Sequence, residues 1–181
     1  IVIGNSSRLW PVFRRAMNED ATLRGADHPL DTYVENALTA VFTEVIAARH
    51  VLHFAHHTTP APIAIQRIAH ASGLAHLSPS RLSIHCTLGP WLALRAVAVV
   101  DVEGPLGERP RPHDPCTACA TPSRLAFARA LALSGAPSAR DVEREWQAWA
   151  DVRRVCPEGK THRYDDDQLR YHYTKDRSIL R

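Results

Sequence analysis

The sequence lacks an apolar run long enough to cross a membrane. A transmembrane helix needs about 20 consecutive apolar residues, and the most apolar stretch, Leu92 to Val102, is interrupted by Arg95 and Asp101. A block of Lys and Arg of the kind that follows a phosphate backbone is also missing, because the 22 basic and 19 acidic residues are spread along the chain. We therefore expect a soluble protein that binds neither a membrane nor nucleic acid.

Cysteine is scarce as well. The chain has four cysteines, which are too few and too unevenly spaced for the disulfide framework of a small secreted domain. This pattern favours a reducing compartment, and we expect the protein to be cytoplasmic.

Motifs of several large enzyme classes are absent. There is no G-x-S-x-G nucleophile elbow, no Walker loop and no G-x-G-x-x-G fingerprint. These absences disfavour common hydrolases, kinases and Rossmann dehydrogenases. We expect no side chain of this protein to act as a covalent nucleophile.

The length of 181 residues is enough for one hydrophobic core. We therefore expect a single domain over residues 1–181. The chain begins at Ile1, without a methionine and already within a strand-like pattern, so we expect that further residues precede it.

Hydrophobic periodicity predicts helices with few strands. Apolar residues at helical spacing predict a helix over residues 30–46, and Trp10, Phe13 and Met17 share one face of an earlier helix with caps at residues 5–7. The other expected helices cover residues 63–77, 123–131, 141–155 and 165–171, with a short tail helix after residue 174. Strands are expected at residues 1–3, 51–57 and 92–102, and the prolines between residues 105 and 122 exclude regular structure. This order predicts an α+β fold.

A single charge, Arg95, lies inside the most apolar strand. Burial of an unpaired guanidinium is costly, so its side chain must reach a partner. The partner is either a protein carboxylate in a structural ion pair or an anionic ligand at the margin of the strand.

Three cysteines and one histidine have the composition of a zinc site. His113, Cys116 and Cys119 are spaced at intervals of three residues, and Cys156 lies far downstream. Together they would form a tetrahedral Cys3His set, although the same thiols can also be plain buried side chains. Three other histidines are expected to be solvated or hydrogen-bonded rather than to bind a metal: His53, His56 and His57.

The order of motifs along the chain resembles the cobalamin-processing proteins of the cblC type. The motifs are L-D-x-x-V (30–34), Q-x-x-A-H-x-x-G (66–73), I-H-x-x-x-G-x-W-x-A-x-R (84–95), R-P-H-D (111–114), W-x-x-W (146–149) and R-Y-x-x-x-Q-x-x-Y (163–171). The similarity extends over nearly the whole chain.

This resemblance implies a nitroreductase-like fold, in which helices pack on an antiparallel sheet. It also implies a protein that binds cobalamin with its lower base detached and removes the upper ligand. Cyanide would leave reductively, with electrons from a reduced flavin (FMN or FAD), and alkyl groups would pass to glutathione or another thiol. The implied partners are a small-molecule corrinoid, a second copy of the chain in a homodimer, or enzymes that use cobalamin.

The resemblance also assigns residues to sites. Those that match the cobalamin-binding positions of the family are Ile63, Ile65, Gln66, His70, Leu77, Ser83, Ile84, His85 and Leu94. The arginines that match positions for the carboxylates of glutathione are Arg95, Arg153 (or Arg154, across a gap) and Arg177.

The sequence also departs from the family pattern. Residues 74–79 replace a run of tyrosines, and the thiol pair of Cys116 and Cys119 has no counterpart in the motif. A binding and trafficking role with little turnover therefore stays open. Two other classes also stay open: a flavin reductase or nitroreductase-like enzyme without cobalamin, and a Cys/His metal-binding redox protein.

Overall fold

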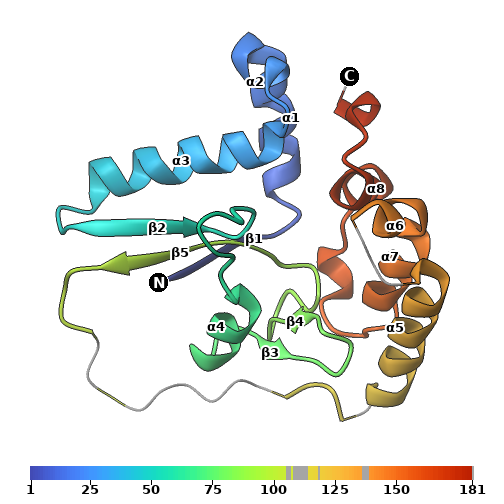
Figure 1. Cartoon of the computed structure of the whole chain (residues 1–181). Helices are drawn as coiled ribbons and strands as arrows, with labels where there is room; N and C mark the ends of the chain where they lie inside the picture. The colour runs from blue at the N-terminus through green and yellow to red at the C-terminus, as the bar shows by residue number, and fades with distance from the viewer. Residues whose placement is uncertain (105–106, 108–113, 118, 136–138, 181) are drawn as a thin grey trace.

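The protein is an assembly of two antiparallel sheets and surrounding helices (Figure 1). The structure, a computed structural model, describes residues 1–104, 107, 114–117, 119–135 and 139–180. The α+β class expected from the sequence is confirmed. No helix among the described residues has both the length and the apolar character that a membrane crossing requires.

The larger sheet has the strand order β1 (Val2–Asn5), β5 (Ala93–Val100) and β2 (His50–Phe54), with both pairs antiparallel. The central position of β5 explains its apolar sequence, because a central strand is covered on both sides by the fold. The second strand is shorter than the sequence predicts, since pairing with β5 ends at Phe54.

The N-terminal helices are α1 (Leu9–Glu19), α2 (Ala21–Gly25) and α3 (Pro29–Val45). The predicted face of α1 is confirmed: Trp10, Phe13 and Met17 are buried together in the largest core cluster. The expected cap is displaced, because the N-cap residue is Arg8 and makes no capping hydrogen bond with its side chain.

The middle of the chain forms α4 (Ile65–Ala71), β3 (His76–Leu77) and β4 (Ser83–Ile84). The helix predicted over residues 63–77 is therefore too long. Gly73 adopts a φ of 79°, which ends the helix. Residues 76–77 then pair with residues 83–84 in the second, two-stranded sheet.

From residue 119 onward, all regular elements among the described residues are helices. It contains α5 (Ala120–Ser134), α6 (Ala139–Arg144), α7 (Trp146–Arg154), η1 (Lys160–His162), α8 (Asp166–Thr174) and η2 (Arg177–Leu180). The prediction of a single helix over residues 141–155 is wrong, because the helix is interrupted at Glu145 and forms two helices, α6 and α7. The predicted acidic cap of α8 is confirmed: the Asp165 carboxylate accepts a hydrogen bond of 2.6 Å from the backbone amide of Gln168.

The helices lie on both faces of the larger sheet. α3 packs against β2 on one face, whereas α4 contacts β1 and β5 on the other (Figure 1). The pairing of β1 with β5 shifts register at Arg95, because Ile3 pairs with Ala96 and Gly4 pairs with Leu94. The two faces therefore carry two separate environments.

Two glycines bring the segment before β5 against the loop before η1. Gly89 has a φ of +57° and Gly159 has a φ of +64°, a region that residues with a side chain rarely adopt. A Cβ at Gly89 would lie 2.2 Å from the carbonyl oxygen of Glu158, and one at Gly159 would lie 2.2 Å from the carbonyl carbon of Leu88. This contact places the loop of residues 85–90 beside the C-terminal helices.

Candidate functional site

The candidate site is a cavity of about 260 Å³ between α4, β4, α7 and the start of β5. Its walls come from four separate segments of the chain. The lining residues are Ile65, Gln66, Leu82, Ser83, Leu92, Ala93, Leu94 and Arg153. Most of this wall is apolar, with a few polar groups that converge on it, which is the usual composition of a small-molecule site.

The cavity unites predicted residues from both assigned sets. Four of the predicted cobalamin contacts line it: Ile65, Gln66, Ser83 and Leu94. The side chain of Ser83 is buried, and its hydroxyl has no hydrogen-bond partner among the described residues. An unpaired buried hydroxyl is costly, so this group is suited to a polar atom of a ligand.

The other predicted cobalamin contacts surround the cavity without lining it. The His70 ring accepts a hydrogen bond of 3.2 Å from the Leu77 amide, which ties the end of α4 to β3. Ile84 packs instead against Cys116 and Cys156. Ile63 precedes α4 and is partly buried.

His85 stabilises the loop that follows β4. Its Nδ1 accepts hydrogen bonds from the amides of Thr87 and Leu88, at 3.1 and 3.2 Å. Burial lowers the pKa of His85, and the nearby His162 lowers it further. A neutral imidazole is required for both accepted bonds, so the shifted pKa and the geometry agree.

Arg153 is the arginine that reaches this cavity. Its Nη1 donates to the carbonyl oxygen of Pro90, and its Nε donates to the Tyr173 hydroxyl at 3.0 Å. The same hydroxyl donates to the carbonyl oxygen of Trp149 at 3.1 Å. These contacts fix the guanidinium at the cavity wall.

Arg95 lies on the opposite face of the sheet from Leu94. Its Nε donates to Asn5 Oδ1 at 2.6 Å, and its Nη1 lies 3.4 Å from Asp31 Oδ1. The side chain borders a second cavity of about 200 Å³ between the sheet, α1 and α3. Its Nη2 is buried and has no partner among the described residues. A structural ion pair is thus present, which is one of the two kinds of partner expected for this charge.

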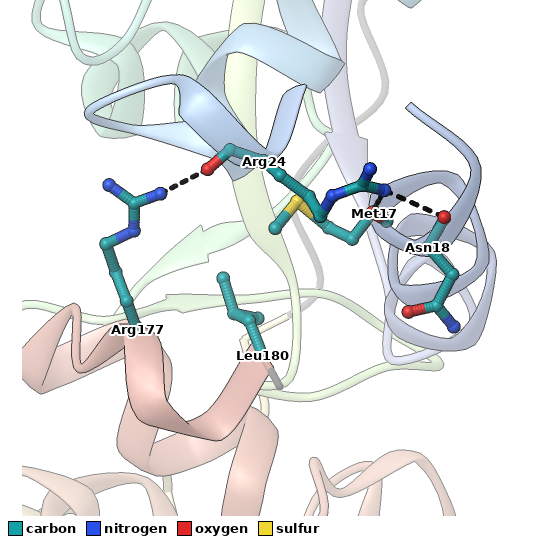
Figure 2. A pocket seen from close by; sticks show the side chains of 5 residues that line it. All are labelled: Met17, Asn18, Arg24, Arg177 and Leu180. Carbon is teal, nitrogen blue, oxygen red and sulfur yellow. Dashed lines mark hydrogen bonds between the residues drawn. The ribbon is translucent and has the colours of Figure 1, made fainter. Parts of the chain in front are cut away.

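Arg154 and Arg177 lie elsewhere. Arg154 pairs with Asp151 at 3.1 Å and with Asp166 at 3.7 Å. Arg177 donates to the carbonyl oxygen of Arg24 and borders a third cavity of about 560 Å³ (Figure 2). The structure therefore does not bring the four predicted arginines together in one cavity.

Two buried tyrosines of the C-terminal part interact electrostatically with these arginines. Burial raises the pKa of Tyr164, while Arg153 and Arg95 lower it. Burial raises the pKa of Tyr171 to about 12, with Asp31 raising it further and Arg177 and Arg95 opposing. Arg95 thus shares one tyrosine neighbour with Arg153 and another with Arg177.

Sequence reasoning missed His172, which is one of the most perturbed groups. Burial lowers its pKa well below the ordinary value, and Arg95, Lys175 and Arg153 lower it further. Its Nε2 has no hydrogen-bond partner among the described residues. No local motif marks this residue, because its environment is created by segments that are distant in sequence.

Three of the four cysteines converge beside the cavity. Cys116, Cys119 and Cys156 are buried, and Cys116 and Cys156 belong to one core cluster with Ile84. Burial raises the pKa of Cys116 to about 11, and Cys119 and Asp114 contribute to the shift. The predicted fourth ligand, His113, lies outside the described residues.

The histidines after β2 make hydrogen bonds, as predicted. The Nε2 atoms of His56 and His57 lie 2.5 and 2.7 Å from the same oxygen of Glu35 on α3. These contacts link the end of β2 to the helix that covers it.

Comparison with known proteins identifies the fold. No protein-family model matches the sequence, and no curated protein sequence is significantly similar to it. Among solved structures, the chain is similar to a C. elegans B12-trafficking protein, CblC, which is a homologue of human MMACHC. The TM-score is 0.73 with 17% sequence identity, and the match covers 99% of this chain and 77% of the other. The resemblance drawn from the motifs is thus confirmed at the level of the fold.

Proposed function

We propose that this chain, which shares its fold with CblC, binds cobalamin and removes its upper axial ligand. The observation that carries the proposal is the cavity beneath α4. It gathers Ile65, Gln66, Ser83 and Leu94, four residues that the motifs assign to cobalamin from three separate segments. These four residues lie in the part of the chain that resembles the cblC-type proteins, and the chain has the fold of CblC.

The lining of the cavity suits a corrinoid. A corrin is a broad apolar disc with amide groups at its edge, so its site needs an apolar wall with a few hydrogen-bonding groups. Leu92 and Leu94 supply apolar wall, while the unpaired Ser83 hydroxyl can bind an edge amide. The cavity volume of about 260 Å³ would accommodate one edge of the corrin. The rest of the corrin would lie outside the cavity.

The protein would contribute positioning and shielding rather than a nucleophile. The cobalt–carbon or cobalt–cyanide bond of the substrate is the reactive bond. In dealkylation, a thiolate sulfur bonds to the alkyl carbon while the cobalt keeps the electron pair of the broken bond. In decyanation, the cobalt of the substrate would be reduced by electrons from a reduced flavin, and cyanide would leave. Both reactions need the substrate to be oriented, which the cavity walls can do.

Arg153 is the residue best placed to orient an anionic thiol. Guanidinium groups bind carboxylates through paired hydrogen bonds, and the contacts with Pro90 and Tyr173 hold this one at the cavity. Arg95 and Arg177 border two other cavities. We therefore assign the thiol carboxylate first to Arg153.

Titration with cob(II)alamin and methylcobalamin, followed by visible spectra, tests the proposal. We expect the spectral shift of the base-off form at one equivalent of corrinoid per chain. Leu94→Asp places a charge in the apolar wall and should weaken binding at least about tenfold, a loss of about 1.4 kcal/mol. The control Val99→Asp changes an exposed residue of the same strand and should bind normally.

The absence of a base-off shift with the unaltered protein would overturn the proposal. Flavin absorbance in the purified protein together with no corrinoid shift would instead identify a flavin enzyme. A base-off shift without loss of the methyl group, in the presence of glutathione or reduced flavin, would restrict the role to binding and trafficking.

A further inference from the structure

Two adjacent histidines and one glutamate converge where β2 ends. The Nε2 atoms of His56 and His57 lie 2.5 and 2.7 Å from the same carboxylate oxygen, Oε1 of Glu35. The ligand atoms of all three residues lie within 4.8 Å of one another. The two histidines are 21 and 22 residues away from Glu35 in sequence, so this group is created by folding.

The local backbone explains why both histidines face the same carboxylate. Adjacent residues of an extended strand point to opposite faces, but the pairing of β2 with β5 ends at Phe54. The His57 amide then donates to the Phe54 carbonyl oxygen at 3.2 Å, which turns the chain. Because the chain reverses its direction between α3 and β2, this turn lies beside the first half of α3, which contains Glu35 (Figure 1).

Aromatic contacts hold the two imidazole rings. The centroid of the buried Phe54 ring lies 5.7 Å from that of His56 and 5.3 Å from that of His57. The two imidazoles contact each other edge to face, with centroids 4.7 Å apart. Side chains that are ordered before binding reduce the entropy cost of binding a ligand. The three ligand atoms are therefore already gathered before an ion binds.

We propose that Glu35, His56 and His57 bind one Zn²⁺ ion. Two imidazoles and one carboxylate are the protein ligands of open zinc sites, in which water takes the fourth position. An ion about 2.1 Å from each ligand atom would separate these atoms by about 3.4 Å. The imidazoles would thus move back from the carboxylate by less than about 1 Å. Room for this movement exists, because the three side chains are 28 to 51% exposed.

The donor set also selects the class of metal. Magnesium and calcium prefer oxygen ligands, whereas imidazoles suit zinc and other transition metals. The sequence pattern favoured hydrogen bonds for these histidines, because it could not place Glu35 beside them. The structure supplies this third ligand.

The ion would hold α3 on the larger sheet. Glu35 lies about one helical turn after Asp31, whose carboxylate pairs with Arg95 of β5. The Ala55 amide, directly before the two histidines, donates to the carbonyl oxygen of Arg95 at 2.8 Å. The ion would therefore fasten the helix beside the second cavity, which α3 and Arg95 border. The site is separate from the cavity beneath α4, whose described lining residues do not include its ligands.

Titration of the corrinoid-free and metal-free protein with Zn²⁺ tests this inference. The protein must carry no histidine tag, because a tag would bind the ion itself. Competition with a chromophoric chelator should give one Zn²⁺ per chain with a Kd in the micromolar range or below. Zn²⁺ should also raise the Tm, because an ion that binds only the folded state stabilises it. Co²⁺ at this site should give visible d–d bands without a thiolate-to-cobalt charge-transfer band, which separates the site from the buried cysteines.

Glu35→Gln distinguishes a metal site from a hydrogen-bonded cluster. The amide oxygen of glutamine can still accept hydrogen bonds from both imidazoles, but it lacks the charge that binds Zn²⁺. We expect this variant to keep the Tm of the metal-free protein and to bind Zn²⁺ at least tenfold more weakly. His56→Ala and His57→Ala should weaken binding to a similar extent. The matched controls Glu44→Gln on α3 and His53→Ala on β2 change exposed residues and should bind like the unaltered protein.

Circular dichroism shows whether each variant is folded, and Glu35→Gln decides if a histidine variant is not. A Kd for Zn²⁺ above about 100 μM, or equal affinity in Glu35→Gln and Glu44→Gln, would overturn the proposal. A thiolate-to-cobalt band together with unchanged affinity in Glu35→Gln would place the ion at the cysteines and would also overturn it. Because these measurements use corrinoid-free protein, failure of the zinc site would leave the cobalamin proposal untouched.

Discussion

The guanidinium of Arg95 and the carboxylate of Asp31 form an ion pair between the central strand and α3. Nη1 and Oδ1 are 3.4 Å apart, and the two side chains are 11% and 15% exposed. Burial lowers the pKa of Arg95, and Asp31 opposes that shift. The charge in the apolar strand therefore has a protein partner, with Asn5 as a second one.

Removal of Asp31 should destabilise the fold strongly. In Asp31→Ala the guanidinium loses its carboxylate but stays buried, which typically costs about 3 to 5 kcal/mol. The exposed pair of Arg49 and Asp101, 3.2 Å apart, offers the comparison: Asp101→Ala should change the free energy of unfolding very little. Urea denaturation measures both variants, and equal effects would show that burial does not govern the strength of the Arg95 pair.

Substitution of Gly89 should disrupt the contact between two loops. In Gly89→Ala, the added Cβ meets the Glu158 carbonyl and the backbone stays at a positive φ. We expect a loss of about 3 kcal/mol or more in the free energy of unfolding. Gly25→Ala, at the end of α2, meets no atom within 4 Å and should be neutral or slightly stabilising. Thermal unfolding of both variants checks this, and a stable Gly89→Ala protein would contradict the observed approach of the loops.

His172 should make stability sensitive to acid. Its pKa in the folded state lies well below the ordinary value of 6.5, chiefly because of burial. As pH falls below about 6.5, the unfolded state takes up a proton that the folded state does not accept. The free energy of unfolding therefore decreases from that pH downward, until the folded-state pKa is reached.

A variant isolates the contribution of this histidine. His172→Phe removes the titrating group and should flatten the decrease between about pH 6.5 and the acid limit of the fold. His28→Gln, which changes an exposed histidine, should leave the pH dependence as it is. Denaturation curves at several pH values measure the difference, and parallel profiles for His172→Phe and the unaltered protein would refute the prediction.

Loss of the Tyr173 hydroxyl should affect the proposed thiol site. Tyr173→Phe leaves the Arg153 Nε without its acceptor at 3.0 Å, so the guanidinium loses its fixed orientation. We expect Tyr173→Phe to lose about 1.4 kcal/mol of binding free energy for glutathione, which corresponds to a tenfold rise in the KM for glutathione. The dissociation constant for methylcobalamin should change little. Tyr33→Phe, beside the second cavity, is the control and should preserve both constants.

Elements with a clear hydrophobic period or a clear cap were predictable from the sequence, whereas the two-residue strands were not. The helix expected over residues 30–46 corresponds to α3, and the buried face of α1 was identified from Trp10, Phe13 and Met17. β3 and β4 were missed, because two-residue strands have no period to detect. Residues 76–77 were therefore assigned to a helix that ends several positions earlier.

The candidate site was predictable only in part, for the same physical reason. Gln66 and Leu94 were identified from motifs, and the structure places both at one cavity. The approach of His76 to Cys116 depends on a hairpin that the sequence does not announce. Contacts between distant segments, such as Arg95 with Asp31, are created by folding and have no local signal.

The register of β5 has a consequence for how this protein can change. Leu94 borders the cavity beneath α4, and Arg95 borders the one beneath α3. Arg95 is an extra residue in the pairing with β1, because Ala96 pairs with Ile3 and Leu94 pairs with Gly4. Deletion of this one residue would make the pairing regular but would remove the charge opposite Asp31, so the ion pair with α3 requires the strand to keep its extra residue.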